Sequence, residues 1–182
     1  ILSSASENGY TASASSEQGT AYAYKAFSGN TTAFWEAATA ANEWIKLAFP
    51  SAVIINRIKM TAASADANKM PDRFKIQGSN DNTDWVDIHE WIDSGTWINN
   101  ESFSFDFENS TAYPWYRVYV LNNQGGARIM IGELSLLTIP IESIYGTIEI
   151  NASETQVVAS IADGFSNKGQ VDYTLALPLI NT

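Results

Sequence analysis

The chain has 182 residues, of which 45% are apolar and 12% aromatic, enough to bury the core of one domain with a small appendage. Twenty acidic residues against ten basic ones give a formal charge of −10, which disfavours nucleic acid and anionic membrane surfaces as partners. The sequence has no cysteine, which excludes disulfides and thiolate chemistry. It also has no apolar run of the roughly 18 residues that a membrane-spanning helix needs.

Short segments of alternating polar and apolar residues recur along the chain and predict β-strands. In chain order they cover residues 44–49 (WIKLAF), 56–60 (NRIKM), 73–77 (RFKIQ), 102–108 (SFSFDFE) and 115–120 (WYRVYV). In the fourth segment Phe103, Phe105 and Phe107 fall on one face, and we expect this face to point inward. Turn formers such as PDR, SNDNTD and NNQGG separate the segments, and no window has the period of an amphipathic helix. The pattern predicts an all-β, antiparallel sandwich.

The composition shifts after Leu137 and divides the chain into residues 1–138 and 139–182. Beyond this point strand patterns lie around residues 147–150, 156–161 and 171–177, with DGFSNKG as a hairpin turn. About 40 residues with two or three strands are too few for an independent core. We therefore expect a short C-terminal β appendage that packs on the sandwich or on other copies of the chain, most plausibly in a homotrimer.

The six tryptophans fall into two groups. Four lie at strand or strand-edge positions, where an aromatic side chain is usually part of the core, and we predict that they are scaffold. These four are Trp35, Trp44, Trp85 and Trp115. Trp91 and Trp97 lie in a segment rich in turn residues, HEWIDSGTWINNES. For these two, burial, stacking on a sugar ring and contact with a partner chain all stay open.

Enzyme chemistry finds little support in the sequence. His89 is the only histidine, so multi-histidine zinc sites and Cys/His dyads are excluded, and no GxSxG or HExxH motif is present. The acidic residues fall mostly in turns and on outward strand faces, as solvated acids do. The stretch SNDNTDW lacks the glycine and the glutamate of an EF-hand loop, so a hairpin turn is the better interpretation. We expect a non-catalytic protein.

Three motifs, in order and spacing, carry a resemblance to a known family. They are KAFSGNTTAFW at residues 25–35, GSNDNTDW at 78–85 and GEL at 132–134. Over about residues 3–138 the chain resembles the discoidin or coagulation-factor 5/8 type C family, which includes the family 32 carbohydrate-binding modules. The resemblance implies an eight-stranded jelly-roll β-sandwich that binds ligands through loops at one end. In this family the ligands are usually glycans and in some members phospholipid head groups.

The resemblance also implies a position for the glycan site. In the related carbohydrate modules three loops form it, which by position are residues 36–43, 64–73 and 122–128 here. Planar amides, charged groups and aromatic faces in these loops would bind sugar hydroxyls and ring faces. The candidate residues are Glu36, Asn68, Lys69, Arg73, Asn123 and Arg128, with Trp97 as a possible platform. Sugar binders of the family often have a histidine at position 36 and an aromatic in the last loop, and this departure weakens the case for simple galactose recognition.

The motif at residues 25–35 implies a structural calcium site. In the family this loop wraps the ion with backbone carbonyls, an aspartate, a threonine and a glutamate near the last strand. By position Lys25, Asn30 and Glu133 are kept, but Ser28 replaces the aspartate and Ala33 the threonine. Calcium takes six to eight oxygens and depends on charged ones, so the ion is expected to be weakly bound, replaced by sodium or water, or absent. The alternative is a tight turn that is unrelated to any ion site.

Several functions remain open at this stage. The leading hypothesis is a non-catalytic carbohydrate-binding module that recognises bacterial surface polysaccharide. An acidic, cysteine-free sugar-binding module with a β appendage is similar in general character to the receptor-binding ends of phage tails. By this analogy the protein would be the receptor-binding tip of a phage tail, exposed on the virion or outside the cell. The alternative is a glycan-targeting module of a secreted glycoside hydrolase or adhesin. Phospholipid binding comes third, because the chain is acidic and the loop at residues 36–43 has no basic residue.

Overall fold

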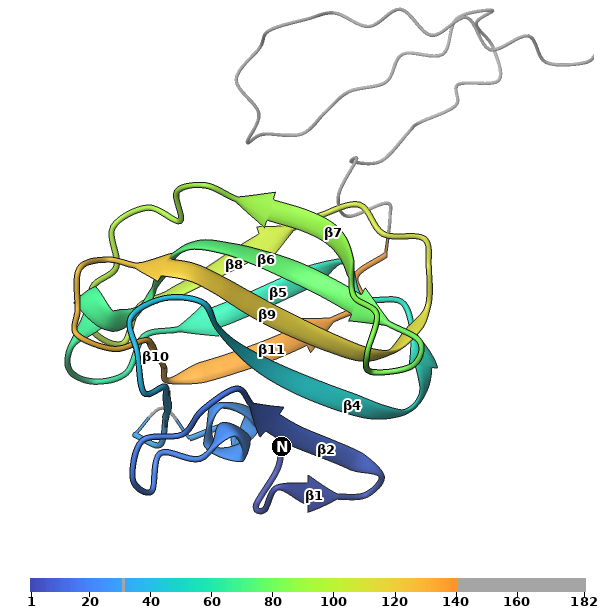
Figure 1. Ribbon diagram of the computed structural model, residues 1–182, viewed down its shortest axis with the longest axis horizontal. Helices are drawn as coiled ribbons and strands as arrows, with labels where there is room; N and C mark the ends of the chain where they lie inside the picture. The colour runs from blue at the N-terminus through green and yellow to red at the C-terminus, as the bar shows by residue number, and fades with distance from the viewer. Residues whose placement is uncertain (31, 141–182) are drawn as a thin grey trace, which may run out of the picture. The chain divides into compact units, whose positions relative to one another are not determined.

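Figure 1 shows the computed structural model, which describes residues 1–30 and 32–140. This part consists of eleven β-strands and two 3₁₀ segments, η1 (Ala23–Phe27) and η2 (Ala67–Lys69). None of its helices is long and apolar enough to cross a membrane. The chain divides into two units, Ile1–Thr138 and Ile139–Thr182. The strands that we predict beyond residue 146 lie outside the described residues.

The larger sheet has six antiparallel strands in the order β1-β2-β4-β9-β6-β7. Their bounds are β1 (Ser6–Glu7), β2 (Tyr10–Ala14), β4 (Glu43–Val53), β9 (Tyr113–Asn123), β6 (Pro71–Ser79) and β7 (Val86–Trp91). At its centre Ile45, Val118 and Ile76 are register partners, and all three are fully buried. Their sequence neighbours point to the other face, because side chains alternate along a strand.

A second layer faces this sheet across the core (Figure 1). It comprises the three-stranded sheet β11-β5-β8 and the short pair β10-β3, again all antiparallel. The bounds are β3 (Trp35–Glu36), β5 (Arg57–Thr61), β8 (Ser102–Asp106), β10 (Met130–Ile131) and β11 (Glu133–Leu137). The predicted all-β antiparallel sandwich is confirmed, and each of the five predicted segments overlaps an observed strand. The strands number more than the eight of the implied jelly roll because several have only two residues.

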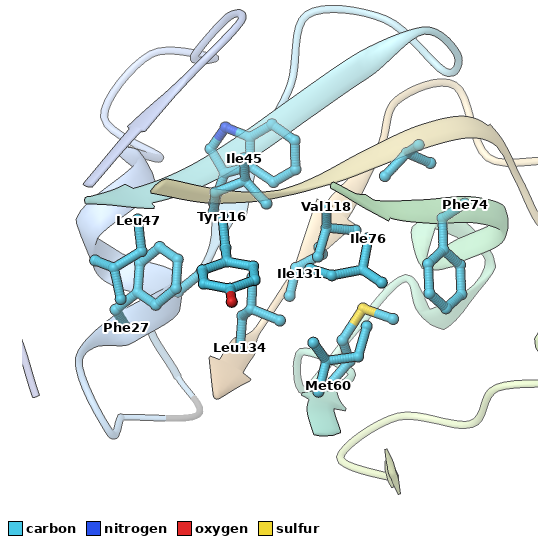
Figure 2. Close-up of a cluster of buried hydrophobic side chains, with 14 of the residues drawn as sticks. Phe27, Ile45, Leu47, Met60, Phe74, Ile76, Tyr116, Val118, Ile131 and Leu134 are labelled. Atoms are coloured by element: carbon cyan, nitrogen blue, oxygen red, sulfur yellow. The ribbon is translucent and has the colours of Figure 1, made fainter. Parts of the chain in front are cut away.

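The core between the layers is apolar and includes a buried tyrosine at its centre (Figure 2). Tyr116 is fully buried, and its hydroxyl donates to the carbonyl of Val53 at 2.8 Å. The same oxygen accepts from Asn109 Nδ2 at 3.1 Å and from the amide of Ile55 at 3.3 Å. Burial raises the pKa of Tyr116, so the phenol stays neutral. A buried hydroxyl with partners avoids the cost of desolvation and ties three chain segments together.

The inward face of β8 forms an aromatic seam. Phe105 lies edge-on to Phe74 at 5.1 Å and to Trp91 at 5.5 Å between ring centroids, and Phe103 packs 4.6 Å from Trp97. Phe105 and Phe107 are buried and Phe103 is half-buried, whereas the intervening polar residues are exposed. The predicted orientation of SFSFDFE is therefore confirmed.

Three of the four tryptophans that we predict as core scaffold lie elsewhere. Trp35 is fully buried, as predicted. Trp44 and Trp115 are half-exposed on the outer face of the six-stranded sheet, because their neighbours Ile45 and Tyr116 occupy the inner face. Trp85 is also half-exposed, in the turn before β7. The prediction was wrong for these three because aromatic residues occur on both faces of the strands.

Residues 80–85 form the predicted hairpin turn between β6 and β7. Asp81 Oδ1 accepts from the amides of Asp84 at 2.8 Å and Thr83 at 2.9 Å, and from the hydroxyl of Ser79 at 3.1 Å. These bonds, first among them the one from the Asp84 amide, lower the pKa of Asp81 from its ordinary 3.8 to about 2. The carboxylate is thus an acceptor that closes the turn.

This shift predicts a pH-dependent contribution to stability. The carboxylate of Asp81 stabilises the fold above its ordinary pKa of 3.8, and this contribution is lost as the pH falls through about 2. Asp81→Asn should therefore melt below the wild type at neutral pH, and the difference should shrink in acid. Thermal melts across this pH range measure it. Asp84→Asn removes an equal charge from the same turn but keeps the backbone amide that bonds Asp81, so it is the control and should melt close to the wild type at neutral pH.

The register of β8 predicts an asymmetry between adjacent residues. Phe105→Ala should lower the free energy of unfolding by about 3 to 5 kcal/mol, because it leaves a cavity among Phe74, Trp91 and Trp97. Ser104→Ala, on the exposed face of the same strand, should change it by less than about 0.5 kcal/mol. Urea unfolding followed by tryptophan fluorescence measures both. Equal effects would contradict the observed register.

Candidate functional site

Loops from separate parts of the chain meet at the end of the sandwich that carries η2 and β10 (Figure 1). The β9–β10 loop donates from the amide of Gly126 to the carbonyl of Asn68 at 3.0 Å, and from Ile129 to Thr39 at 2.9 Å. The amide of Ala67 donates to Asn99 Oδ1 at 3.0 Å, which adds the β7–β8 loop. The three loops that the family resemblance implies therefore lie together, with a fourth beside them.

A salt bridge fixes the position of the charged groups at this end. The ammonium of Lys69 lies 2.9 Å from Glu36 Oε1 and 2.9 Å from Asp66 Oδ2. The bonds to Asp66 and then to Glu36 raise the pKa of Lys69. The side chains of Lys69 and Glu36 are only 19% and 12% exposed, so their geometry is constrained. Within the described part of the chain Glu36 uses only Oε1, which leaves Oε2 as an acceptor for a ligand.

The β9–β10 loop approaches Lys69 closely because it has glycine at position 126. A Cβ there would lie 2.7 Å from Cγ of Lys69 and 3.0 Å from the carbonyl oxygen of Asn68. The side chain of Asn123 shapes this loop: Nδ2 donates to the carbonyls of Arg128 at 2.6 Å and Gly126 at 3.1 Å. Its Oδ1 accepts from the amide of Gly125 at 3.1 Å. Asn123, a predicted binding residue, thus has its amide engaged within the loop.

Two predicted residues keep side chains that can reach a ligand. Asn68 is exposed and Arg128 half-exposed. Neither side chain makes a hydrogen bond or ion pair with residues 1–30 or 32–140. The structure therefore brings Glu36, Asn68, Lys69 and Arg128 to one end of the fold, with Asp66 as a partner that sequence reasoning missed. We call these five residues the loop cluster.

Trp97 and Arg73 do not belong to the loop cluster. Trp97 is 4% exposed, and its indole N–H donates to Ser94 Oγ at 2.9 Å and to the carbonyl of Pro71 at 3.2 Å. A buried ring cannot act as an exposed platform, so that prediction was wrong. Arg73 lies in β6 and its Nη2 is 2.6 Å from Glu90 Oε1, so its guanidinium pairs across to β7. The sequence placed Arg73 near the loop without showing to which face its side chain points.

A hollow of about 250 Å³ lies beside the loop cluster, and sequence reasoning missed it. Its lining includes Gln18, Lys25, Thr32 and Glu36. Close by in the chain, Tyr22 is 40% exposed and stacks on Tyr24 with ring centroids 6.0 Å apart. The only sequence signal was the repeat of tyrosine in AYAYK, which has the spacing of a strand but lies at the start of η1.

The loop at residues 25–35 uses its oxygens within the protein. The carbonyl of Lys25 accepts from the hydroxyl of Ser28 at 2.7 Å, and the carbonyl of Asn30 accepts from the amide of Ala33 at 2.9 Å. Glu133 accepts from the amide of Gly29 at 3.0 and 3.1 Å, so the predicted closure of the loop by this residue is confirmed. Burial raises the pKa of Glu133, which this amide bond partly offsets.

These residues do not fit calcium. Ser28 supplies a neutral hydroxyl that already bonds the Lys25 carbonyl, and Ala33 supplies no side-chain oxygen. Among the residues that the structure describes, Glu133 is the acid that hydrogen-bonds to the loop, and no three acidic, histidine or cysteine side chains there are grouped to hold a metal. Calcium needs six to eight oxygens, several of them charged. Instead, the hydroxyl of Ser28 closes the turn through its hydrogen bond to the carbonyl of Lys25.

The donor set predicts that calcium has little effect on this protein. Calorimetric titration of the chelator-treated chain should detect no sub-micromolar binding, and chelator should leave the melting temperature unchanged. The double variant Ser28→Asp with Ala33→Thr adds a carboxylate and a hydroxyl to the loop. We expect this variant to gain a calcium-dependent rise in melting temperature. Tight binding by the wild type would show that backbone carbonyls suffice.

Comparison with solved structures finds several with a similar fold. The module CpGH89CBM32-5 from Clostridium perfringens, in complex with GalNAc-β-1,3-galactose, superposes with a TM-score of 0.62 at 20% identity, over 71% of this chain and 96% of that one. The family 32 module of NanJ from C. perfringens, in complex with galactose, gives 0.59 at 22% identity, over 70% and 93%. The family 32 module of AlyQ, in complex with 4,5-unsaturated mannuronic acid, gives 0.58 at 20%, over 71% and 95%.

The sequence itself supports the same relationship. No curated protein sequence matches the chain. The family model of the F5/8 type C domain matches residues 11–134, which include all three loops and the strands that position them. The chain therefore belongs to the F5/8 type C domain family.

Proposed function

We propose that this protein is a non-catalytic carbohydrate-binding module and that the loop cluster holds the glycan. One observation carries the proposal: the Glu36–Lys69 pair is held in fixed geometry next to a hollow of about 250 Å³. Sugar sites need donors and acceptors at fixed positions, because adjacent hydroxyls offer both. A restrained pair loses little side-chain entropy when a ligand binds.

The loop cluster and the nearby Tyr22 supply different contacts in this proposal, and Asp66 holds the ammonium of Lys69 in position. The free Oε2 of Glu36 accepts from one hydroxyl, and the ammonium of Lys69 donates its third hydrogen to the neighbouring hydroxyl. Asn68 and Arg128 supply further donors from the rim. The ring of Tyr22, exposed at the start of η1, offers an aromatic face to the C–H surface of a sugar.

The comparisons support glycan binding in general and leave the sugar open. The three similar modules were solved with the disaccharide GalNAc-β-1,3-galactose, with galactose and with 4,5-unsaturated mannuronic acid. This chain has Glu36 where galactose binders of the family often have histidine, so we do not assign it galactose. Its ligand in this proposal is a polysaccharide of a bacterial surface.

The parent protein acts outside the cell in this proposal. The leading context remains a phage tail fibre or tail tip, in which a homotrimer would present three sites on the virion. A module of a secreted glycoside hydrolase or adhesin is the alternative, and the similar modules favour it because one of them bears the name of a hydrolase family. Phospholipid binding stays the least favoured, because the loop cluster contains two acids for two bases.

The proposal is tested by a pair of charge-matched variants. Lys69→Ala removes a donor from the loop cluster, whereas Arg73→Ala removes an equal charge from the sheet face. A glycan array first identifies a ligand for the wild type, and calorimetry then compares affinities. We expect Lys69→Ala to weaken binding about tenfold or more, since hydrogen bonds to charged groups contribute about 1.5 to 3 kcal/mol. Arg73→Ala should bind as the wild type does.

Two further measurements complete this test. Melting curves of both variants show that the fold is intact, and Glu36→Gln, which keeps the shape of the side chain, should also weaken binding. An unchanged affinity in Lys69→Ala and Glu36→Gln would move the site elsewhere. A chain that binds no glycan but sediments with phosphatidylserine vesicles would replace the proposal with lipid binding.

A further inference from the structure

The outer face of the six-stranded sheet carries a cluster of cations and aromatic rings. Lys46 on β4 and Arg117 on β9 are direct register partners. Two residues further along these strands, on the same face, Trp44 lies opposite Tyr119. The ring of Trp85, from the turn before β7, contacts both Lys46 and Arg117. Like charges directly opposite each other destabilise a sheet, so this pair needs a compensating interaction.

The aromatic rings supply part of this compensation. Cζ of Arg117 lies 4.1 Å from the ring centroid of Trp85 and 5.4 Å from that of Tyr119. Nζ of Lys46 lies 5.1 Å from the ring of Trp44 and 5.9 Å from that of Trp85. Rings attract cations through their negative faces at such distances. The side chains are thereby held at the surface in a restricted set of positions.

Neither cation forms an ion pair with a carboxylate in the described part of the chain; Asp87, which accepts from Gln77 Nε2, interacts with Arg117 only at longer range. Arg117 Nε donates to Gln77 Oε1 at 2.6 Å, and Lys46 Nζ donates to Asn82 Oδ1 at 2.5 Å, both neutral acceptors. By contrast, Lys75 on the same sheet does form an ion pair, with its Nζ 2.6 Å from Asp87 Oδ2. Burial lowers the pKa of both Lys46 and Arg117, and the charge of Arg117 lowers that of Lys46 further.

We propose that this face is a second glycan site, at which Arg117 and Lys46 bind the carboxylate of an acidic sugar in a polysaccharide. The terminal nitrogens of Arg117 make no hydrogen bond with residues 1–30 or 32–140, so they can bind a carboxylate in bidentate fashion. The carboxylate supplies the negative charge that the cation pair lacks. This site involves none of the residues of the loop cluster and does not depend on the proposed function of that cluster.

The rings favour a sugar over other acidic partners. Trp44, Trp85 and Tyr119 surround the cations and are partly exposed, so their edges and faces can contact the C–H surface of a pyranose ring. An acidic peptide has no such flat apolar face beside its carboxylate. The net charge of −10 gives no long-range attraction for a polyanion, so affinity must come from these local contacts.

The test uses polygalacturonate, with a neutral galactan as the uncharged polymer and polyglutamate as the acidic peptide. Calorimetry of the whole chain should show binding of polygalacturonate alone, weakening as salt rises. Lys46→Gln and Arg117→Gln should each weaken it about tenfold or more, because each removes a charged donor. Arg57→Gln is the matched control, since Arg57 pairs with Asp106 on the other sheet and should not affect binding.

No binding of polygalacturonate, equal binding of polyglutamate or galactan, or an equal loss in Arg57→Gln would each overturn the proposal. Lys69→Ala should leave polygalacturonate binding intact; loss in that variant together with unchanged binding by Lys46→Gln would assign the acidic sugar to the loop cluster instead. Failure of the loop cluster to bind any glycan would leave this second site unaffected.

A second readout needs no variant, in case Arg117→Gln fails to fold. In a ¹⁵N NMR titration of the wild type with a galacturonate oligomer, the indole N–H signals of Trp44 and Trp85 should shift. Those of Trp35 and Trp97 should stay in place, because both indoles donate to backbone carbonyls in the interior. Shifts confined to other residues would place the ligand away from the sheet and overturn the proposal.

Discussion

The packing of two unequal layers of strands around one apolar core is the constraint on which the rest of this structure depends. Ile45, Val118 and Ile76 form the centre of the larger sheet and are fully buried in the same core cluster as Met60 of the smaller one (Figure 2). Burial of such side chains contributes about 1.5 to 3 kcal/mol each. This interior determines the register of every long strand, because a slip of one residue would turn the whole set toward solvent.

Both proposed sites follow from this register. Since side chains alternate, burial of Ile45 and Tyr116 requires Trp44, Lys46 and Arg117 to share the outer face. At the end of the same strands, the loops are held by backbone hydrogen bonds and by the close approach that Gly126 allows. The rigid scaffold thus positions side chains from distant parts of the chain.

Strands were predictable from the sequence where polar and apolar residues alternate without interruption, as in SFSFDFE. The candidate site was predictable only as far as the three loops. Glu36 and Lys69 were found, but their mutual salt bridge was not, because a pair separated by 33 residues leaves no local pattern. Asp66 was missed although it lies three residues from Lys69. Trp97 was misplaced because turn residues surround it in sequence, while in space it packs on Phe103 of β8 and donates to the carbonyl of Pro71, 26 residues away.

The sequence by itself determined the all-β class, the inward face of β8 and the hairpin turn at Asp81. All of these depend on residue identity or on neighbours a few positions away. Only the tertiary structure decided which tryptophans are buried and that Lys46 meets Arg117 among aromatic rings. Such contacts join residues far apart in the chain, and their burial depends on what the opposite strand or sheet supplies.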